Sequence, residues 1–284
     1  MMRRQAEFCG VQIITYSLMS NHFHILTRVP PQPEITDGEL LKRSADFYGQ
    51  SAPETLRIAE SIRIEGKIPD QERIRLLKRM NDVSVFMKEL KQRFTIWYNK
   101  RNHRFGTLWA ERFRSILVED RADVVRTVAA YIDLNPVRAG MVEDPANYRF
   151  CGYAEAAAGI AMAIRGIESF EGTGGSDWRR VVGKYRETLF SKAGLGETNG
   201  TLEAVRIRKI WKAKGKLSVA QAIRLRIRYF KDGAVLGSQL FVEEIFQKYR
   251  ERFSAKRQTG ARTLRRMPFP ELRTLRALRV CPVE

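Results

Sequence analysis

Cysteine and histidine are scarce in this chain of 284 residues, which contains three of each. The cysteines, Cys9, Cys151 and Cys281, are far apart and form no Cys-x-x-Cys pair. A disulfide framework and a cysteine-rich zinc site are therefore not expected, and a reducing cytoplasm is the natural compartment. The sequence also lacks an apolar run of the roughly 20 residues that a membrane span needs. Because the basic segment Met1–Glu7 leads into no apolar signal segment, we predict a cytoplasmic protein without a membrane partner.

Acidic residues are outnumbered as well. The chain has 51 Lys and Arg against 32 Asp and Glu, a formal charge of +19 and a pI near 10.2. From Thr201 to the end there are 21 basic and 7 acidic residues. Such a balance says nothing about the fold, but it favours a polyanionic partner, of which nucleic acid is the most common.

Two of the three histidines lie in one stretch, Tyr16–Thr27, which has many strand-forming residues and no proline or glycine. This composition predicts a buried strand, with a bend near Ser20 and Asn21. Side chains alternate along a strand, so His22 and His24 share a face. We predict that they bind one metal ion between them; the alternative is a pair of polar residues on a solvated face.

A helix is predicted from Val83 to Tyr98, capped by Asp82, because apolar residues recur at helical spacing with basic residues on the opposite face. The following residues, 99–118, mix arginines with aromatic side chains. This mixture is typical of grooves that bind single-stranded nucleic acid, although ordinary strand packing explains it equally well. His103, within this basic loop, is interpreted as a surface residue and not as a metal ligand.

A second helix is predicted from Asp120, as its cap, to about Asn135, because Pro136 disfavours a helical conformation in the residue before it. Tyr131 and Asn135 are four residues apart and so lie on one face of its last turn. Beside a two-histidine site, a phenol and a carboxamide would both have a chemical role.

Three ordered motifs within residues 7–154 resemble those of the single-tyrosine HUH transposases, and more narrowly the REP-associated tyrosine transposases of bacteria. The motifs are Asn21-His22-Phe23-His24, then Gly106-Thr-Leu-Trp109 with Arg112 after it, then Tyr131-Ile-Asp-Leu-Asn135-Pro-Val-Arg-Ala-Gly140. The resemblance implies an α+β fold with a ferredoxin-like antiparallel sheet, to which this chain adds a basic α-helical C-terminal region.

The resemblance also implies the chemistry. Tyr131 would be the nucleophile, and His22, His24 and Asn135 would bind a divalent metal, Mg²⁺ or Mn²⁺. Many relatives have Gln where this chain has Asn135, which is shorter by one methylene. The reaction would nick and rejoin single-stranded or hairpin DNA through a 5′-phosphotyrosine link, with no organic cofactor, in a monomer or homodimer associated with the bacterial nucleoid.

Basic and aromatic residues at several positions are predicted to contact DNA, on the strength of their charge and position. Arg112 and Arg138 are candidates for phosphate contacts. The full set of predicted DNA-binding residues is Lys91, Arg93, Arg104, Trp109, Arg112, Arg114, Arg138, Arg224, Arg226 and Arg228.

The predicted organisation is a catalytic domain at 1–158, with a helical insertion at about 37–80, and a basic helical region at 176–284. Relatives usually open with a further strand and helix, so a shortened N-terminus and weak activity are expected. The main alternative is a catalytically inactive nucleic-acid-binding relative, decayed or domesticated. A zinc hydrolase built on the two histidines is a third hypothesis, but it lacks an obvious third His or carboxylate.

Overall fold

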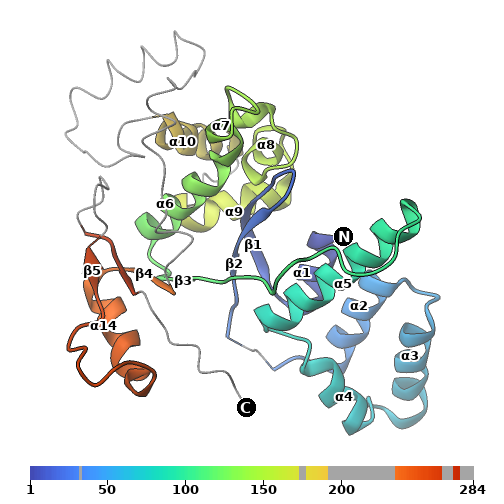
Figure 1. The fold of residues 1–284 in the computed structure, drawn as a ribbon. Helices are drawn as coiled ribbons and strands as arrows, with labels where there is room; N and C mark the ends of the chain where they lie inside the picture. The colour runs from blue at the N-terminus through green and yellow to red at the C-terminus, as the bar shows by residue number, and fades with distance from the viewer. Residues whose placement is uncertain (32–33, 173–176, 191–233, 264–270, 276–284) are drawn as a thin grey trace. The chain divides into compact units, whose positions relative to one another are not determined.

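The computed structural model describes the chain except residues 32–33, 173–176, 191–233, 264–270 and 276–284. It is an α+β protein that consists of two compact units (Figure 1). Unit 1 contains Met1–Ile13 and Thr27–Phe113, and unit 2 contains Ile14–Leu26 and Arg114–Glu284. Among the described residues, no helix combines the length and the apolar character that crossing a membrane requires.

Unit 1 is helical. Its helices are α1 (Met2–Cys9), α2 (Asp37–Tyr48), α3 (Pro53–Glu65), α4 (Asp70–Leu77) and α5 (Val83–Arg101). Helices α2, α3 and α4 lie within residues 37–80, so the helical structure predicted for this segment is confirmed. The Asp82 cap of α5 is confirmed, since its carboxylate accepts hydrogen bonds from the amides of Ser84 and Val85. Phe8 of α1 stacks on Phe47 of α2 at 4.6 Å between ring centroids and anchors the packing of these helices.

The histidine stretch is a β-hairpin and not the single strand that the sequence predicts. Strand β1 (Gln12–Leu18) pairs with β2 (Phe23–Arg28), and the amide of Met19 donates to the carbonyl of His22 at 2.8 Å. Ser20 and Asn21 therefore lie at a complete reversal of the chain. The sheet formed by these strands has two members, with one further bridge from Ser17 to Cys151.

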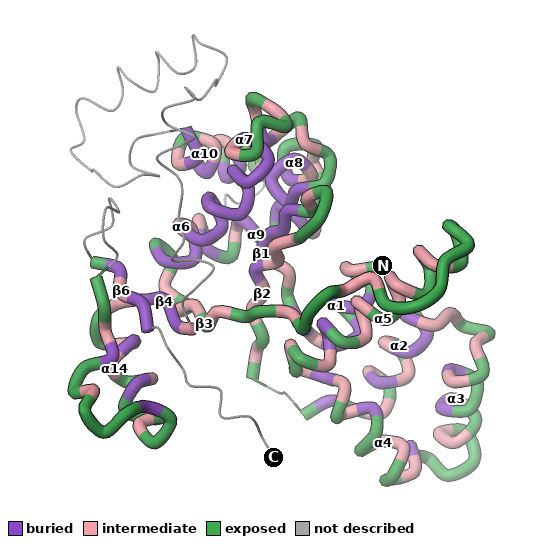
Figure 2. The backbone as a smooth tube through the Cα atoms, in the orientation of Figure 1, coloured by how far each residue is buried: buried purple, intermediate pink, exposed green. Residues whose placement is uncertain are grey.

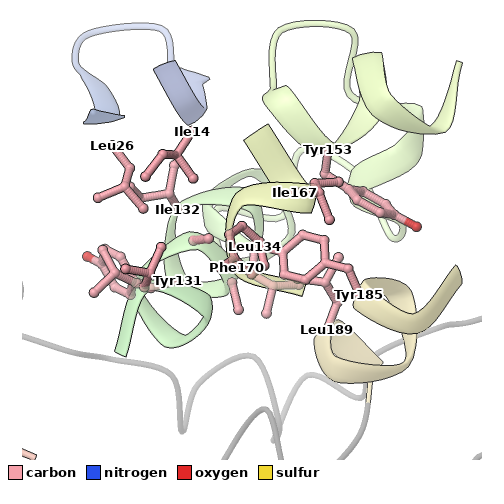
Figure 3. Close-up of a cluster of buried hydrophobic side chains, with 14 of the residues drawn as sticks. Ile14, Leu26, Tyr131, Ile132, Leu134, Tyr153, Ile167, Phe170, Tyr185 and Leu189 are labelled. Carbon is pink, nitrogen blue, oxygen red and sulfur yellow. The ribbon is translucent and has the colours of Figure 1, made fainter. Parts of the chain in front are cut away.

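Behind the hairpin, unit 2 is built from helices that enclose its largest apolar cluster. They are α6 (Ala122–Asp133), α7 (Asn135–Arg138), α8 (Gly152–Ala157), α9 (Ala161–Glu171) and α10 (Trp178–Phe190), with a 3₁₀ turn at Pro145–Asn147. Ile14 and Leu26 of the hairpin join side chains of α6, α9 and α10 in this cluster (Figure 3). Figure 2 shows α6 as mostly buried, because neighbours surround most of its turns.

A second sheet completes unit 2. Its strand order is β3 (Leu117–Val118), β4 (Val235–Gly237), β6 (Arg273–Leu275) and β5 (Arg262–Thr263); β3 runs parallel to β4, and the other neighbours are antiparallel. Helix α14 (Gln239–Lys248) follows β4, and the hydroxyl of Ser238 accepts a hydrogen bond from the amide of Phe241. Ser238 is therefore the N-cap of α14. A 3₁₀ turn at Arg250–Arg252 lies beyond α14.

One detail differs from the sequence-based expectations. Helix α6 begins one residue later than expected, with Arg121 as its N-cap and no side-chain cap, so the prediction of an Asp120 cap is wrong. The described parts of the C-terminal region, including α10 and β4, pack against α9 and β3 within the same unit as Tyr131. Residues 191–233, which include much of the basic C-terminal region, lie outside the described residues.

Gly152, the first residue of α8, lies close to strand β1. A Cβ at this position would lie 2.3 Å from Oγ1 of Thr15 and 3.1 Å from the backbone nitrogen of Tyr16. Backbone atoms cannot rotate out of the way as a side chain can. We therefore expect Gly152→Ala to lower the free energy of unfolding by roughly 1–3 kcal/mol. Urea denaturation measures the change.

The matched control is Gly183→Ala in α10, where a Cβ would meet nothing within 4 Å. In an open helical position this change should stabilise the protein by about 0.5–1 kcal/mol. If the two variants were equally stable, the close approach of α8 to β1 would be wrong.

Candidate active site

The two histidines at the hairpin have adjacent rings. The ring centroids of His22 and His24 are 5.2 Å apart, and the rings are nearly perpendicular. His22 is exposed at the end of the turn, whereas His24 is half-buried within β2. Nδ1 of His22 lies 2.7 Å from Oδ1 of Asn21. An oxygen acceptor there requires a proton on Nδ1, which leaves Nε2 of His22 with the lone pair that a metal ligand needs.

Tyr131 on α6 lies next to the second histidine. Its ring centroid is 5.9 Å from that of His24, in an edge-to-face arrangement. The residue is only 4% exposed, and both its phenolic oxygen and Nε2 of His24 are buried. Figure 3 shows the hydroxyl directed away from the apolar cluster that holds the ring. The structure thus brings both histidines together with a tyrosine that lies far from them in the sequence.

Asn135, one helical turn beyond Tyr131, is also buried. Its Nδ2 donates to the carbonyls of Tyr131 at 3.1 Å and Ile132 at 3.3 Å. These bonds orient the amide so that Oδ1 is the atom left for other contacts. Nη1 of Arg138 lies 3.4 Å from this oxygen, and the guanidinium carbon of Arg138 is 4.5 Å from the centroid of the Tyr131 ring. Arg138 therefore contacts both the candidate ligand and the candidate nucleophile.

The donor set fits a divalent ion, with one condition. Two adjacent imidazoles and an amide oxygen with a fixed orientation are suitable ligands for Mn²⁺ and acceptable ones for Mg²⁺. A divalent cation at Oδ1 of Asn135 and the guanidinium of Arg138 would repel each other by several kcal/mol at this separation. Metal binding through Asn135 therefore requires Arg138 to move away from that oxygen.

Asp133, between Tyr131 and Asn135, is a buried residue next to the candidate site that the sequence does not single out. It is completely buried, and three groups donate to its carboxylate: Oγ1 of Thr15 at 2.7 Å, the hydroxyl of Tyr185 at 2.8 Å and the amide of Tyr153 at 3.2 Å. The donors come from β1, α10 and α8. A single carboxylate thus connects the hairpin of the two histidines to the helix that carries Tyr131.

Burial raises the pKa of Asp133 to about 7, although the three hydrogen bonds favour its charged form. The same burial raises the pKa of Tyr153 to about 12 and places the pKa of the Cys151 thiol far above its ordinary value. The pKa of Tyr185 is also raised, first by burial and then by the nearby Asp133. Of these four groups, only Asp133 changes its protonation near neutral pH.

The residues predicted to contact DNA have different surroundings. Lys91 donates to the carbonyl of Glu111 at 2.8 Å and lies over the ring of Trp109. Arg93 lies over the ring of Phe47 at 4.1 Å. Lys91, Arg93 and Trp109 therefore all have contacts within the protein. The others in the described part of the chain are Arg104, Arg112 and Arg114, which are exposed, and Arg138, which is half-buried. Arg224, Arg226 and Arg228 lie outside the described residues.

No protein-family model, curated protein or solved structure matches this chain. Within the described ranges, no group of three or more His, Cys, Asp or Glu side chains is placed to hold a metal ion. Asn135 is not among these residue types. The geometry around Tyr131, together with the motifs that place it, therefore carries the functional conclusion.

Proposed function

We propose that this chain is a metal-dependent DNA strand transferase of the single-tyrosine HUH type, with a core related to the ferredoxin-like sheet of that family. The observation that carries the proposal is the adjacency of His22, His24 and Tyr131, with ring centroids 5.2 and 5.9 Å apart. Asn135, four residues after Tyr131 at the start of α7, would supply the amide oxygen that the family motif places there.

In the proposed reaction, the phenolic oxygen of Tyr131 attacks a phosphodiester of single-stranded DNA. A bond forms between that oxygen and phosphorus, the bond from phosphorus to the 3′ oxygen breaks, and the phenolic proton is balanced by the proton that the 3′ oxygen takes up. A divalent ion held by His22, His24 and Asn135 would supply Lewis-acid polarisation of the phosphate. The 5′-phosphotyrosine keeps the energy of the phosphodiester, so a 3′-hydroxyl of another strand reverses the step without ATP.

One observation favours the alternative, an inactive nucleic-acid-binding relative. The hydroxyl of Tyr131 is buried, and Arg138 lies against its ring. A phosphodiester reaches this hydroxyl only after neighbouring side chains move. Because metal binding at Asn135 also requires Arg138 to move, we propose that the two rearrangements are the same one and that the inactive alternative is the less favoured.

The direct test is covalent adduct formation. The full chain is incubated with a pool of single-stranded and hairpin oligonucleotides of randomised sequence, labelled at the 3′ end, in Mn²⁺ or in EDTA. A labelled protein band that survives denaturing electrophoresis and depends on Mn²⁺ supports the transferase. Metal-dependent DNA binding without any adduct, even with excess protein, would favour the inactive relative.

Metal binding is tested separately with Mn²⁺ alone. Loss of a residue that hydrogen-bonds to a metal ligand typically weakens metal affinity by roughly 10–100-fold. Because His22 and His24 are proposed as ligands themselves, we expect His22→Ala and His24→Ala each to weaken Mn²⁺ affinity by more than this. The remaining histidine provides the control, since His103→Ala alters an exposed loop residue and should leave the affinity unchanged. Electron paramagnetic resonance of free Mn²⁺ gives the affinities, and equal values for all three variants would contradict the proposed ligands.

A further inference from the structure

The C-terminal end of α5 carries large apolar side chains that are exposed. Phe105, in the loop after the helix, is 96% exposed, and Trp97 is 48% exposed. Figure 2 shows the end of α5 and the following loop as an exposed segment, and in Figure 1 it projects beyond α1 and α2 of the same unit. Exposed apolar side chains that gather in one segment are candidates for binding, whereas a single one is common on protein surfaces.

The charge around these rings has one sign. Between Leu90 and Ala110 the chain has five basic residues and no acidic one. Lys100, Arg101 and Arg104 are exposed, and the guanidinium carbon of Arg101 lies 6.0 Å from the centroid of the Trp97 ring. We name the group of Trp97, Lys100, Arg101, Arg104 and Phe105 the basic–aromatic tip. The tip combines positive charge for phosphates with ring faces for bases.

The loop that presents Phe105 is tied back onto α5. Nδ2 of Asn99 donates to the carbonyl of Gly106 at 2.8 Å, and the amide of Arg104 donates to the carbonyl of Asn99 at 3.0 Å. Nε1 of Trp109 donates to Oγ1 of Thr95 at 2.9 Å and so holds the far end of the loop. A ring presented by an ordered loop loses little entropy when it binds, which favours a recognition role.

We propose that the basic–aromatic tip binds single-stranded nucleic acid, with a base stacked on Phe105 and the phosphates on either side contacted by Arg101 and Arg104. Charge complementarity selects a polyanion, and the exposed rings select one whose bases are unstacked. The site lies in unit 1, whereas the chemistry proposed for Tyr131 lies in unit 2. It requires neither metal nor the phenol, so it goes beyond the proposed reaction.

The test measures binding by the full chain in EDTA, which removes any contribution from metal-dependent chemistry. A fluorescent single strand of mixed sequence and its duplex are titrated with wild type, Phe105→Ala and Leu56→Ala. We expect Phe105→Ala to weaken single-strand binding by about fivefold to hundredfold, the range for loss of one base stack, and duplex binding much less. Because Phe105 is almost fully exposed, the variant should fold like wild type. Leu56, 55% exposed on α3, is the matched control and should have no effect.

Two further measurements complete the test. Arg104→Gln should reduce the slope of log affinity against log salt by about 0.7 on single strands. Ultraviolet crosslinking to a strand that contains 5-iododeoxyuridine should label tryptic peptides with Trp97 or Phe105. Unchanged single-strand affinity of Phe105→Ala, or crosslinks confined to other peptides, would overturn the proposal. Loss of self-association or of anionic-vesicle binding in Phe105→Ala, with DNA affinity unchanged, would also overturn it and assign the tip to a protein or a lipid surface.

Discussion

Replacing Asp133 by alanine is expected to lower the free energy of unfolding by about 3 kcal/mol or more. The substitution leaves the hydroxyls of Thr15 and Tyr185 and the amide of Tyr153 buried without their acceptor. Each unsatisfied buried group costs roughly 1–3 kcal/mol. The loss should also loosen the connection between β1 and α6, and hence between the histidine pair and Tyr131.

Asp133→Asn is the matched control, because it keeps the size of the side chain and one oxygen acceptor. At neutral pH its amide can donate to the hydroxyl of Thr15 or Tyr185, since a hydroxyl can rotate to accept. We therefore expect it to be much closer to wild type in stability than Asp133→Ala. Urea denaturation midpoints at pH 7 compare the stabilities of the two variants and wild type. An alanine variant as stable as wild type would show that the hydrogen bonds to the buried carboxylate do not stabilise the fold.

The pH dependence of stability gives a second readout for Asp133. Its folded pKa, about 7, lies above the ordinary value of an aspartate, so between these two values the folded state binds more protons than the unfolded state. The stability contributed by this group is complete at low pH, falls as pH rises through this window, and is flat above about pH 7. The free energies of unfolding of wild type and Asp133→Asn are compared at each pH, so that the contributions of the other carboxylates cancel. Their difference should change by roughly 2–4 kcal/mol between pH 4 and pH 7.

Tyr131→Phe is expected to abolish the covalent DNA adduct entirely, because no other atom of the ring can attack phosphorus. The variant keeps the ring that contacts His24 and Arg138, so folding, Mn²⁺ affinity and DNA binding should stay near wild type. Adduct yield by denaturing gel, with DNA affinity measured in parallel, separates a loss of chemistry from a loss of binding.

Tyr153→Phe is the control for removing a buried phenol from the same unit. Its hydroxyl contacts Arg186 at 3.0 Å and has no part in the proposed reaction, so this variant should still form the adduct. An adduct in Tyr131→Phe at the wild-type level would assign the nucleophile elsewhere. Equal loss in both variants would mean that general damage to unit 2, and not the missing nucleophile, explains the result.

The sequence predicts local features of the site well. Alternation along a strand predicts adjacent side chains at His22 and His24, and helical spacing places Tyr131 and Asn135 one turn apart. The structure has both pairs adjacent, although His22 lies in the turn before β2. Both predictions depend on contacts within a few residues, where backbone geometry alone decides the outcome. The metal, the reaction and the DNA partner stay predictions.

Features that depend on distant parts of the chain were not predictable in the same way. In the sequence, Asp133 is one polar residue in a helical pattern. Its donors Thr15 and Tyr185 belong to other elements, so the sequence does not show that they meet its carboxylate. The hairpin reversal at Ser20 and Asn21 has no glycine or proline to mark it, so the sequence suggested one bent strand. The contact between Lys91 and Trp109 is a further feature that the sequence does not show, because charge and aromatic content do not reveal which side chains meet.

The hairpin has a consequence for the order of events during synthesis. Thr15 leaves the ribosome 118 residues before Asp133, and translation at about 5–20 residues per second makes that interval roughly 6–24 s. An isolated two-stranded hairpin is marginally stable in water. During this interval Ile14 and Leu26 have none of their later neighbours from α6, while the helices of unit 1 can already fold. The nascent chain is therefore exposed to aggregation and open to chaperones at the hairpin, until α6 emerges and the two histidines meet Tyr131.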